Sequence, residues 1–275
     1  MNFIARRAAS AFTIQLVAKR HHSTNIVANT ISNDKNRLRL DEEKYCNDIS
    51  SPLKEPFGGV LEALAKKTEA EFRNPHMMVS SLQGKLLHQL VSIFRPQHVL
   101  EIGGFTGYSA IAMGSALSPK ATLLSLELDP KCIEFAQTFV NEAQLQDKVK
   151  FRQGPAIDSL AYLGQTITSN ANKTKLDADK GGYIQYFDSI LKHDLLSEKG
   201  ILLVDNVLFF GHVYKQAGQI SNQVEIDEEK HESASENINK TALKVHKFNQ
   251  HVANDHRVES VSLPLFDGLT IIRKK

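Results

Sequence analysis

The sequence has few cysteines, little net charge and no long apolar run. Cys46 and Cys132 are the only two cysteines among 275 residues, which is too few for a disulfide framework, and they lack metal-ligand spacing. Two thiols of this kind are typical of a reducing compartment. A formal net charge of +2 does not indicate a nucleic-acid-binding protein. No apolar run approaches the roughly 18 residues of a membrane span. The length allows one sizeable core or at most two small domains.

Acidic residues are missing from the first 33 positions, and Asp34 is the first of them. The same stretch carries Arg6-Arg7 and Lys19-Arg20 among serines, threonines and apolar residues. This composition is typical of a mitochondrial transit peptide. We therefore expect residues 1–35 to be a leader to the mitochondrial matrix, cleaved near His21–Asn25. The alternative is a basic tail without a targeting role, on a cytoplasmic chain.

The rest of the chain predicts an α/β fold. Residues 36–55 are polar and contain Pro52, so they are expected to be a linker to one domain over residues 56–275. Strands separated by helices imply βαβ units and a parallel sheet, here Rossmann-like and doubly wound. The apolar spacing predicts helices over 60–72, 82–94, 108–117 and 130–144, and strands over 98–103, 122–128, 149–153 and 200–204.

Two segments near the C-terminus differ from this alternation. Residues 215–244 are rich in Glu, Lys, Asn and Ser, which predicts a solvated loop or polar insertion. Apolar runs over 258–265 and 268–273 flank Phe266-Asp267, which predicts an antiparallel hairpin at the edge of the sheet.

The strongest local motif is the string from Val99 to Ser109, in which an apolar strand runs into a glycine-rich turn and then a helix. Gly103 and Gly104 allow close approach of a ligand to the backbone, and the helix end presents free N–H groups. In an open α/β sheet, ligands bind at this carboxyl end of the strands. A ligand-free tight turn is the alternative.

Two acidic residues indicate which ligand this turn would take. Glu101 lies at the end of the first strand, where it would repel a pyrophosphate but suit a ligand carrying an ammonium and a sulfonium. Glu127 ends the next strand, where an acidic residue holds ribose hydroxyls. A nicotinamide cofactor is the alternative, but Phe105 breaks the G-x-G-x-x-G spacing. The pattern favours a cationic nucleoside without phosphates.

The glycine string resembles that of the caffeoyl-CoA and catechol O-methyltransferase family. The resemblance runs from about Val60 to the C-terminus, interrupted by residues 215–244. Further matching strings, in chain order, are Met78-Val79-Ser80 with Gln83-Gly84, Arg152 to Ala156, Asp177-Ala178-Asp179-Lys180, Asp205 to Leu208, Lys247-Phe248-Asn249 and Leu263 to Gly268.

The resemblance implies an S-adenosylmethionine-dependent enzyme that methylates a small hydroxyl acceptor, and a homodimer. For the methionine end of the cofactor, it implies contacts with Glu101, Gly103, Gly104, Ser109 and Asp179. It further implies that Val79 contacts the cofactor through its backbone, that Glu127 holds the ribose and that Ala156 lies near the adenine.

A hydroxyl acceptor has to lose its proton, and a phenol titrates near about pH 10. A hard cation such as Mg²⁺, held by oxygen ligands, can favour the oxyanion. Asp205 and Asn206 follow the apolar run 200–204 and could supply two such ligands, although such a pair also fits a turn. Asp177 is similarly placed after the preceding element. In the family these residues resemble, the trio binds the metal, and Lys180 matches a lysine that assists deprotonation.

One segment departs from the family. Where the family has an apolar strand before the Asp-Ala-Asp-Lys string, residues 170–176 are polar and include Lys173 and Lys175. A central strand buried on both faces should be almost entirely apolar. Either this strand is missing or shortened, or another segment takes its place. If the strand is lost, the chain could bind S-adenosylmethionine without methylating anything.

Overall fold

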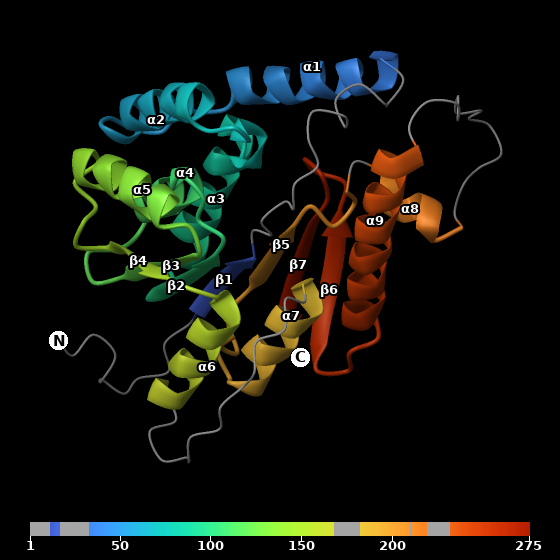
Figure 1. Cartoon of the computed structure of the whole chain (residues 1–275). Helices are drawn as coiled ribbons and strands as arrows, with labels where there is room; N and C mark the ends of the chain where they lie inside the picture. The colour runs from blue at the N-terminus through green and yellow to red at the C-terminus, as the bar shows by residue number, and fades with distance from the viewer. Residues whose placement is uncertain (1–11, 17–32, 168–181, 210, 219–231) are drawn as a thin grey trace.

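The computed structural model describes residues 12–16, 33–167, 182–209, 211–218 and 232–275. In these residues a seven-stranded sheet has the order β4-β3-β2-β1-β5-β7-β6, with helices around it (Figure 1). The strands are β1 (Phe12–Leu16), β2 (His98–Ile102), β3 (Thr122–Glu127), β4 (Val149–Gln153), β5 (Leu202–Asp205), β6 (Val258–Leu263) and β7 (Leu269–Lys274). The helices are α1 (Asn33–Ile49), α2 (Phe57–Glu71), α3 (Ser81–Phe94), α4 (Tyr108–Gly114), α5 (Pro130–Glu142), α6 (Ala156–Ile167), α7 (Gly182–Lys192), α8 (His212–Gln216) and α9 (Glu232–Ala253), with a 3₁₀ turn at Pro75–Met77.

The sheet confirms the predicted fold class. β4, β3, β2, β1 and β5 pair in parallel, whereas β7 pairs antiparallel to both β5 and β6. The β6–β7 hairpin therefore closes one edge of a mostly parallel, Rossmann-like sheet.

Apolar side chains project from both faces of the sheet, as a doubly wound fold requires. Along β2, Val99 joins the core under α2, α3, α4 and α5, while Leu100 joins the core under α6, α7 and α9. Leu203 and Leu202 of β5 divide in the same way. Figure 1 shows these two helix groups on either side of the strands.

Two segments expected to be irregular contain helices in the parts that the structure describes. α1 covers most of the predicted linker, with Leu40, Tyr45 and Ile49 exposed. The prediction of a solvated loop over 215–244 was wrong for residues 232–244, which belong to α9. Ile238, Ala242 and Val245 are buried there beside Phe209 and Val213. Their helical spacing is an apolar stripe that the many polar residues around it conceal.

β1 comes from the segment expected to be a leader. It pairs in parallel with β2 on one side and with β5 on the other, so it is an interior strand. The polar segment 170–176, which stands where the family has an apolar strand, lies outside the described residues.

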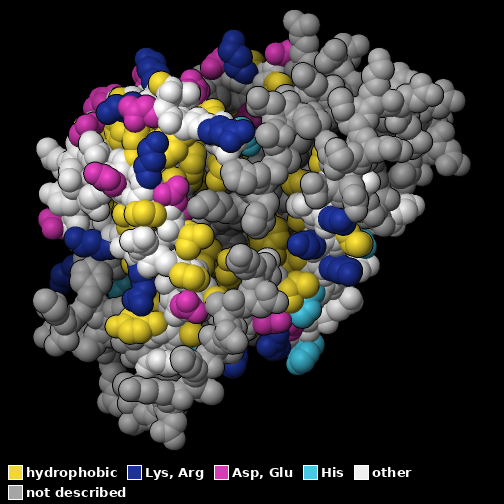
Figure 2. Space-filling view, in the orientation of Figure 1, with side chains coloured by type: hydrophobic (Ala, Val, Ile, Leu, Met, Phe, Trp, Pro, Cys, Tyr) yellow, Lys and Arg dark blue, Asp and Glu magenta, His cyan; other side chains and the backbone are white. Residues whose placement is uncertain are grey.

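Basic and acidic side chains are mixed over the described part of the face shown in Figure 2. None of the described helices combines the length and the hydropathy that a bilayer crossing needs.

Candidate cofactor and metal site

The turn after β2 runs close against β3. Gly103 has a φ of 85° and donates its N–H to the carbonyl of Leu126 at 2.7 Å. A Cβ on Gly104 would lie 2.2 Å from Ser125 Oγ and 3.2 Å from Glu101 Oε2. Only glycine fits at position 104, because a Cβ there would collide with the side chain of Ser125.

Glu101 is fully buried at the end of β2. Its two carboxylate oxygens accept hydrogen bonds from Ser109 Oγ and Ser125 Oγ, both at 2.5 Å. Burial raises the pKa of this carboxyl, and the negative charge of Glu127 raises it further, against the two hydroxyl donors. A bound cation would relieve this strain on the ionised form.

Glu127 is buried at the end of β3. Its Oε2 accepts the backbone N–H of Phe105 at 2.9 Å, and its Oε1 accepts those of Leu128 and Asp129 at 2.8 and 2.9 Å. These bonds fix the carboxylate against the glycine turn. Two carboxylates at neighbouring strand ends favour a cationic ligand with hydroxyl groups over one carrying phosphates.

Val79 and Ala156 are two further predicted cofactor residues that the structure describes. Val79 is buried just before α3, in one core with Tyr108 of α4. Ala156 begins α6, and Gly154, two residues before it, donates its N–H to the carbonyl of Glu127 at 3.1 Å. The structure thus brings seven predicted residues to one region, namely Val79, Glu101, Gly103, Gly104, Ser109, Glu127 and Ala156.

Asp205 and Asn206 lie at the carboxyl end of β5, and both are buried. Asp205 Oδ2 accepts a hydrogen bond from Gln83 Nε2 at 2.9 Å, and its Oδ1 accepts the N–H of Asn206 at 2.8 Å. Asn206 has a φ of 60°, a left-handed conformation that turns the chain sharply. A carboxylate and an amide oxygen are donors that suit a hard cation such as Mg²⁺.

Two further side chains form hydrogen bonds with backbone carbonyls of this turn. Tyr183 donates its hydroxyl to the carbonyl of Asp205, and Asn249 Nδ2 donates to the carbonyl of Val207, both at 2.8 Å. The sequence did not single out Gln83, Tyr183 or Asn249 by role. Gln83 and Asn249 stood in the family-like strings, and that was the only signal for them.

Three predicted residues cannot be placed. Asp177, Asp179 and Lys180 lie outside the described residues. The proposed third metal ligand, the proposed lysine and one proposed cofactor contact therefore stay predictions.

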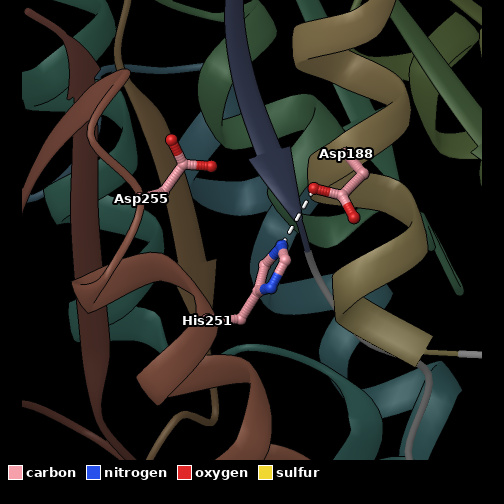
Figure 3. Close-up of side chains that lie close together, drawn as sticks. All are labelled: Asp188, His251 and Asp255. Carbon is pink, nitrogen blue, oxygen red and sulfur yellow. Dashed lines mark hydrogen bonds and ion pairs between the residues drawn. The ribbon is translucent and has the colours of Figure 1, made fainter.

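Asp188, His251 and Asp255 form a separate cluster in which one ligating atom of each lies within 4.8 Å of the others (Figure 3). His251 Nε2 lies 2.9 Å from Asp188 Oδ1. Arg257 Nη2 lies 2.5 Å from Asp255 Oδ2 and 3.6 Å from Asp188 Oδ1. Because a guanidinium already faces both carboxylates, the cluster is an ion-pair network that joins α7, α9 and the loop between α9 and β6.

This network lies at the opposite end of the strands from Asp205. Asp205 pairs with Leu269, which pairs with Leu263 at the end of β6. Asp255 precedes Val258, at the start of β6, so it lies at the amino-terminal edge of the parallel strands. It takes no part in the site at their carboxyl edge.

Known proteins resemble both the sequence and the fold. The family model described as O-methyltransferase matches residues 49–275. A catechol O-methyltransferase of Niastella koreensis is 38% identical over 150 residues, covering 54% of this chain and 66% of its own. O-methyltransferase ankF of Aspergillus thermomutatus is 29% identical over 234 residues, covering 85% of this chain and 92% of its own.

A solved structure gives the same result for the fold. The methyltransferase PaMTH1 of Podospora anserina, determined with S-adenosylhomocysteine bound, is 27% identical with a TM-score of 0.69, over 89% of this chain and 97% of its own. The match confirms the family suggested by the glycine turn and excludes the nicotinamide alternative. The chain belongs to the S-adenosylmethionine-dependent O-methyltransferase family.

Proposed function

We propose that this O-methyltransferase transfers the methyl group of S-adenosylmethionine to one hydroxyl of a vicinal aromatic diol, with a divalent cation bound. The observation that carries the proposal is the buried Asp205-Asn206 turn, at the same sheet edge as the acid-lined glycine turn. The acceptor class is a catechol or a hydroxycinnamoyl thioester, since relatives are named catechol and caffeoyl-CoA O-methyltransferases.

The chain's own residues position the reaction. Glu101 would hold the ammonium of the cofactor, and Glu127 its ribose hydroxyls, at the same end of the parallel strands as Asp205. Asp205 and Asn206, with Asp177 proposed as a third ligand, would hold Mg²⁺. When bound, the ion lowers the pKa of an acceptor hydroxyl by Lewis-acid polarisation. We assign Lys180 to assist that deprotonation, and Asp179 to border the methionine moiety of the cofactor.

The test is methyl transfer from labelled S-adenosylmethionine to a panel of vicinal aromatic diols, with the matching monohydroxy compounds as controls. We expect product from the diols alone, loss of activity with a chelator and recovery with Mg²⁺ or Mn²⁺. Cofactor binding without transfer to any acceptor would favour the alternative of a catalytically impaired relative. Transfer undiminished by chelator would remove the metal from the proposal.

Two further proposals concern the whole chain. We propose a homodimer, supported by the family resemblance and by the exposed apolar side chains of α1. We also propose a mitochondrial location, supported by the basic, acid-free composition of the first 33 residues. Fractionation of cells with an antibody to the native chain tests the second proposal, which a purely cytosolic signal would contradict.

A further inference from the structure

β1 ends level with both turns of the site. Its last residue, Leu16, pairs with Ile102, directly before Gly103, and also with Val204, directly before Asp205. The cofactor turn and the proposed metal turn are therefore separated by one intervening strand, or about 10 Å for two strand spacings. A single strand sets the distance between the two halves of the site.

The pairing of β1 is complete on the β2 side, where all five residues from Phe12 to Leu16 have partners. On the β5 side, Ile14, Gln15 and Leu16 are paired with Leu202, Leu203 and Val204. A strand that lies between two parallel neighbours can form backbone hydrogen bonds with both of them. Phe, Thr and Ile are also residues that strands favour.

Without β1, the strands β2 and β5 could either stay in place or move together, and both outcomes are unfavourable. If β2 and β5 stayed in place, the facing edges of two strands with buried side chains would lose their partners, and unpaired backbone groups in the interior are costly. If β2 and β5 moved together to pair, Asp205 would shift by about one strand spacing, ~5 Å, toward the cofactor turn. Either change disrupts the site.

We propose that residues 12–16 are a permanent strand of the folded enzyme, and that the slot between β2 and β5 takes this segment of the chain as its occupant. Cleavage near His21–Asn25 would cut β1 from the rest of the chain. The mature enzyme must therefore still contain residues 12–16, and any leader that is removed must end before Phe12. The role of β1 in spacing the site rests on the proposed function, whereas its place in the sheet does not.

Hydrogen exchange of the full-length protein, followed by mass spectrometry, tests the pairing without any variant or activity. We expect the amides of residues 12–16 to exchange as slowly as those of β2. Residues 51–54, which are outside any helix or strand, provide the rapidly exchanging reference. Exchange of 12–16 at the rate of this reference would overturn the proposal.

A pair of substitutions in the full chain tests the consequence. Ile14→Pro removes a ladder N–H and cannot be accommodated in an interior strand, whereas Ile14→Val keeps a β-branched residue. We expect Ile14→Pro to lower the melting temperature and to abolish exchange protection over 12–16, and Ile14→Val to preserve both. Equal melting temperatures of Ile14→Pro and the unmodified protein would overturn the proposal. The melting temperature and the hydrogen exchange do not depend on enzyme activity. Both therefore test β1 even if no acceptor is methylated and the proposed function fails.

Discussion

Glu101 combines complete burial with two hydroxyl donors and a nearby like charge, so its ionisation is coupled to whatever binds beside it. Its pKa is raised in the free protein, and a bound ammonium would favour the ionised form and bring the pKa down. The carboxyl is thus mostly protonated at pH values below its raised pKa, and a cationic ligand that pairs with it there must displace a proton.

We predict that affinity for S-adenosylmethionine falls as the pH decreases through the raised pKa of Glu101, because the protonated carboxyl cannot pair with the ammonium. Calorimetry in buffers of different ionisation enthalpy should show proton release on binding in this range. Glu101→Gln should bind more weakly and lose the proton release. An unchanged pH profile in that variant would show that another group is responsible.

The raised pKa of Glu101 acts in the opposite direction on the folding stability of the ligand-free protein. Cofactor affinity is expected to rise with pH, whereas this stability falls with pH. An acid whose pKa is raised on folding makes the folded state less stable as the pH rises from the unfolded to the folded pKa. The raised pKa of Glu101 therefore lowers the stability of the free protein above the ordinary pKa of a carboxyl, and a cation bound beside Glu101 would reduce this cost.

Asp205 should be essential for turnover but not for cofactor binding. Asp205→Ala removes the proposed carboxylate ligand, while Glu101 and Glu127 remain, so we expect turnover to be abolished and S-adenosylhomocysteine affinity to be nearly unchanged. Asp188→Asn neutralises a carboxylate at the opposite sheet edge and is the matched control, which should keep its activity. Full activity of Asp205→Ala would show that the turn is only structural.

Gln83 should act through Asp205. Removing an outer hydrogen-bond partner of a metal ligand typically costs about 10–100-fold in metal affinity, so Gln83→Ala should raise the Mg²⁺ concentration needed for half-maximal turnover by that factor. Excess Mg²⁺ should restore the rate. A loss of rate that Mg²⁺ does not restore would assign Gln83 a different role.

At the level of elements, Asp255 joins the end of α9 to the start of β6. The pKa of Asp255 is lowered to about 2 from 3.8, first by the hydrogen bonds from Arg257. A lowered pKa contributes stability that is present above about pH 4 and is lost as the pH falls toward 2. Asp255→Asn should flatten that part of the stability–pH curve.

At neutral pH, Asp255→Asn should cost roughly 1.5–3 kcal/mol for its hydrogen bonds to a charged group. For a chain of this size each 1 kcal/mol corresponds to about 2–4 °C in melting temperature. Glu259→Gln, which breaks the exposed ion pair with Arg273, is the control and should change little. Equal effects of the two substitutions would contradict a special role of the network.

The elements that were predictable from sequence carry local signals. The apolar spacing over 130–144 marked α5, and the apolar run into Gly103 marked β2 and the cofactor turn. β1 gave no such signal, because it lies in a stretch with the composition of a leader, and only its pairing with the distant strands β2 and β5 identifies it. The buried stripe of α9 was hidden for a related reason, since its partners Phe209 and Val213 lie in α8 and the turn before it. The Gln83–Asp205 bond also joins distant positions, and only the family resemblance drew attention to both.

At the scale of the whole molecule, α1 exposes large apolar side chains that a monomer would leave in contact with water. Leu40, Tyr45 and Ile49 are 64–66% exposed, and large apolar residues in such positions are usual at interfaces between subunits. We predict a dimer by light scattering of the full chain, weakened by Leu40→Ser together with Ile49→Ser. Ile93→Ser, at an equally exposed position of α3, is the control and should leave the dimer intact. A monomeric unmodified protein would contradict the prediction.

The place of β1 in the sheet also has a consequence for biosynthesis. A ribosome releases residues 12–16 before both strands that flank them, and one of these neighbours, β5, belongs to the last third of the sequence. The innermost strand must therefore wait until most of the chain has been made, and contacts this distant in sequence slow folding. Meanwhile an apolar segment stays available to other chains and to chaperones. The enzyme's yield in a cell would then depend on how well that first segment is kept from associating elsewhere during translation.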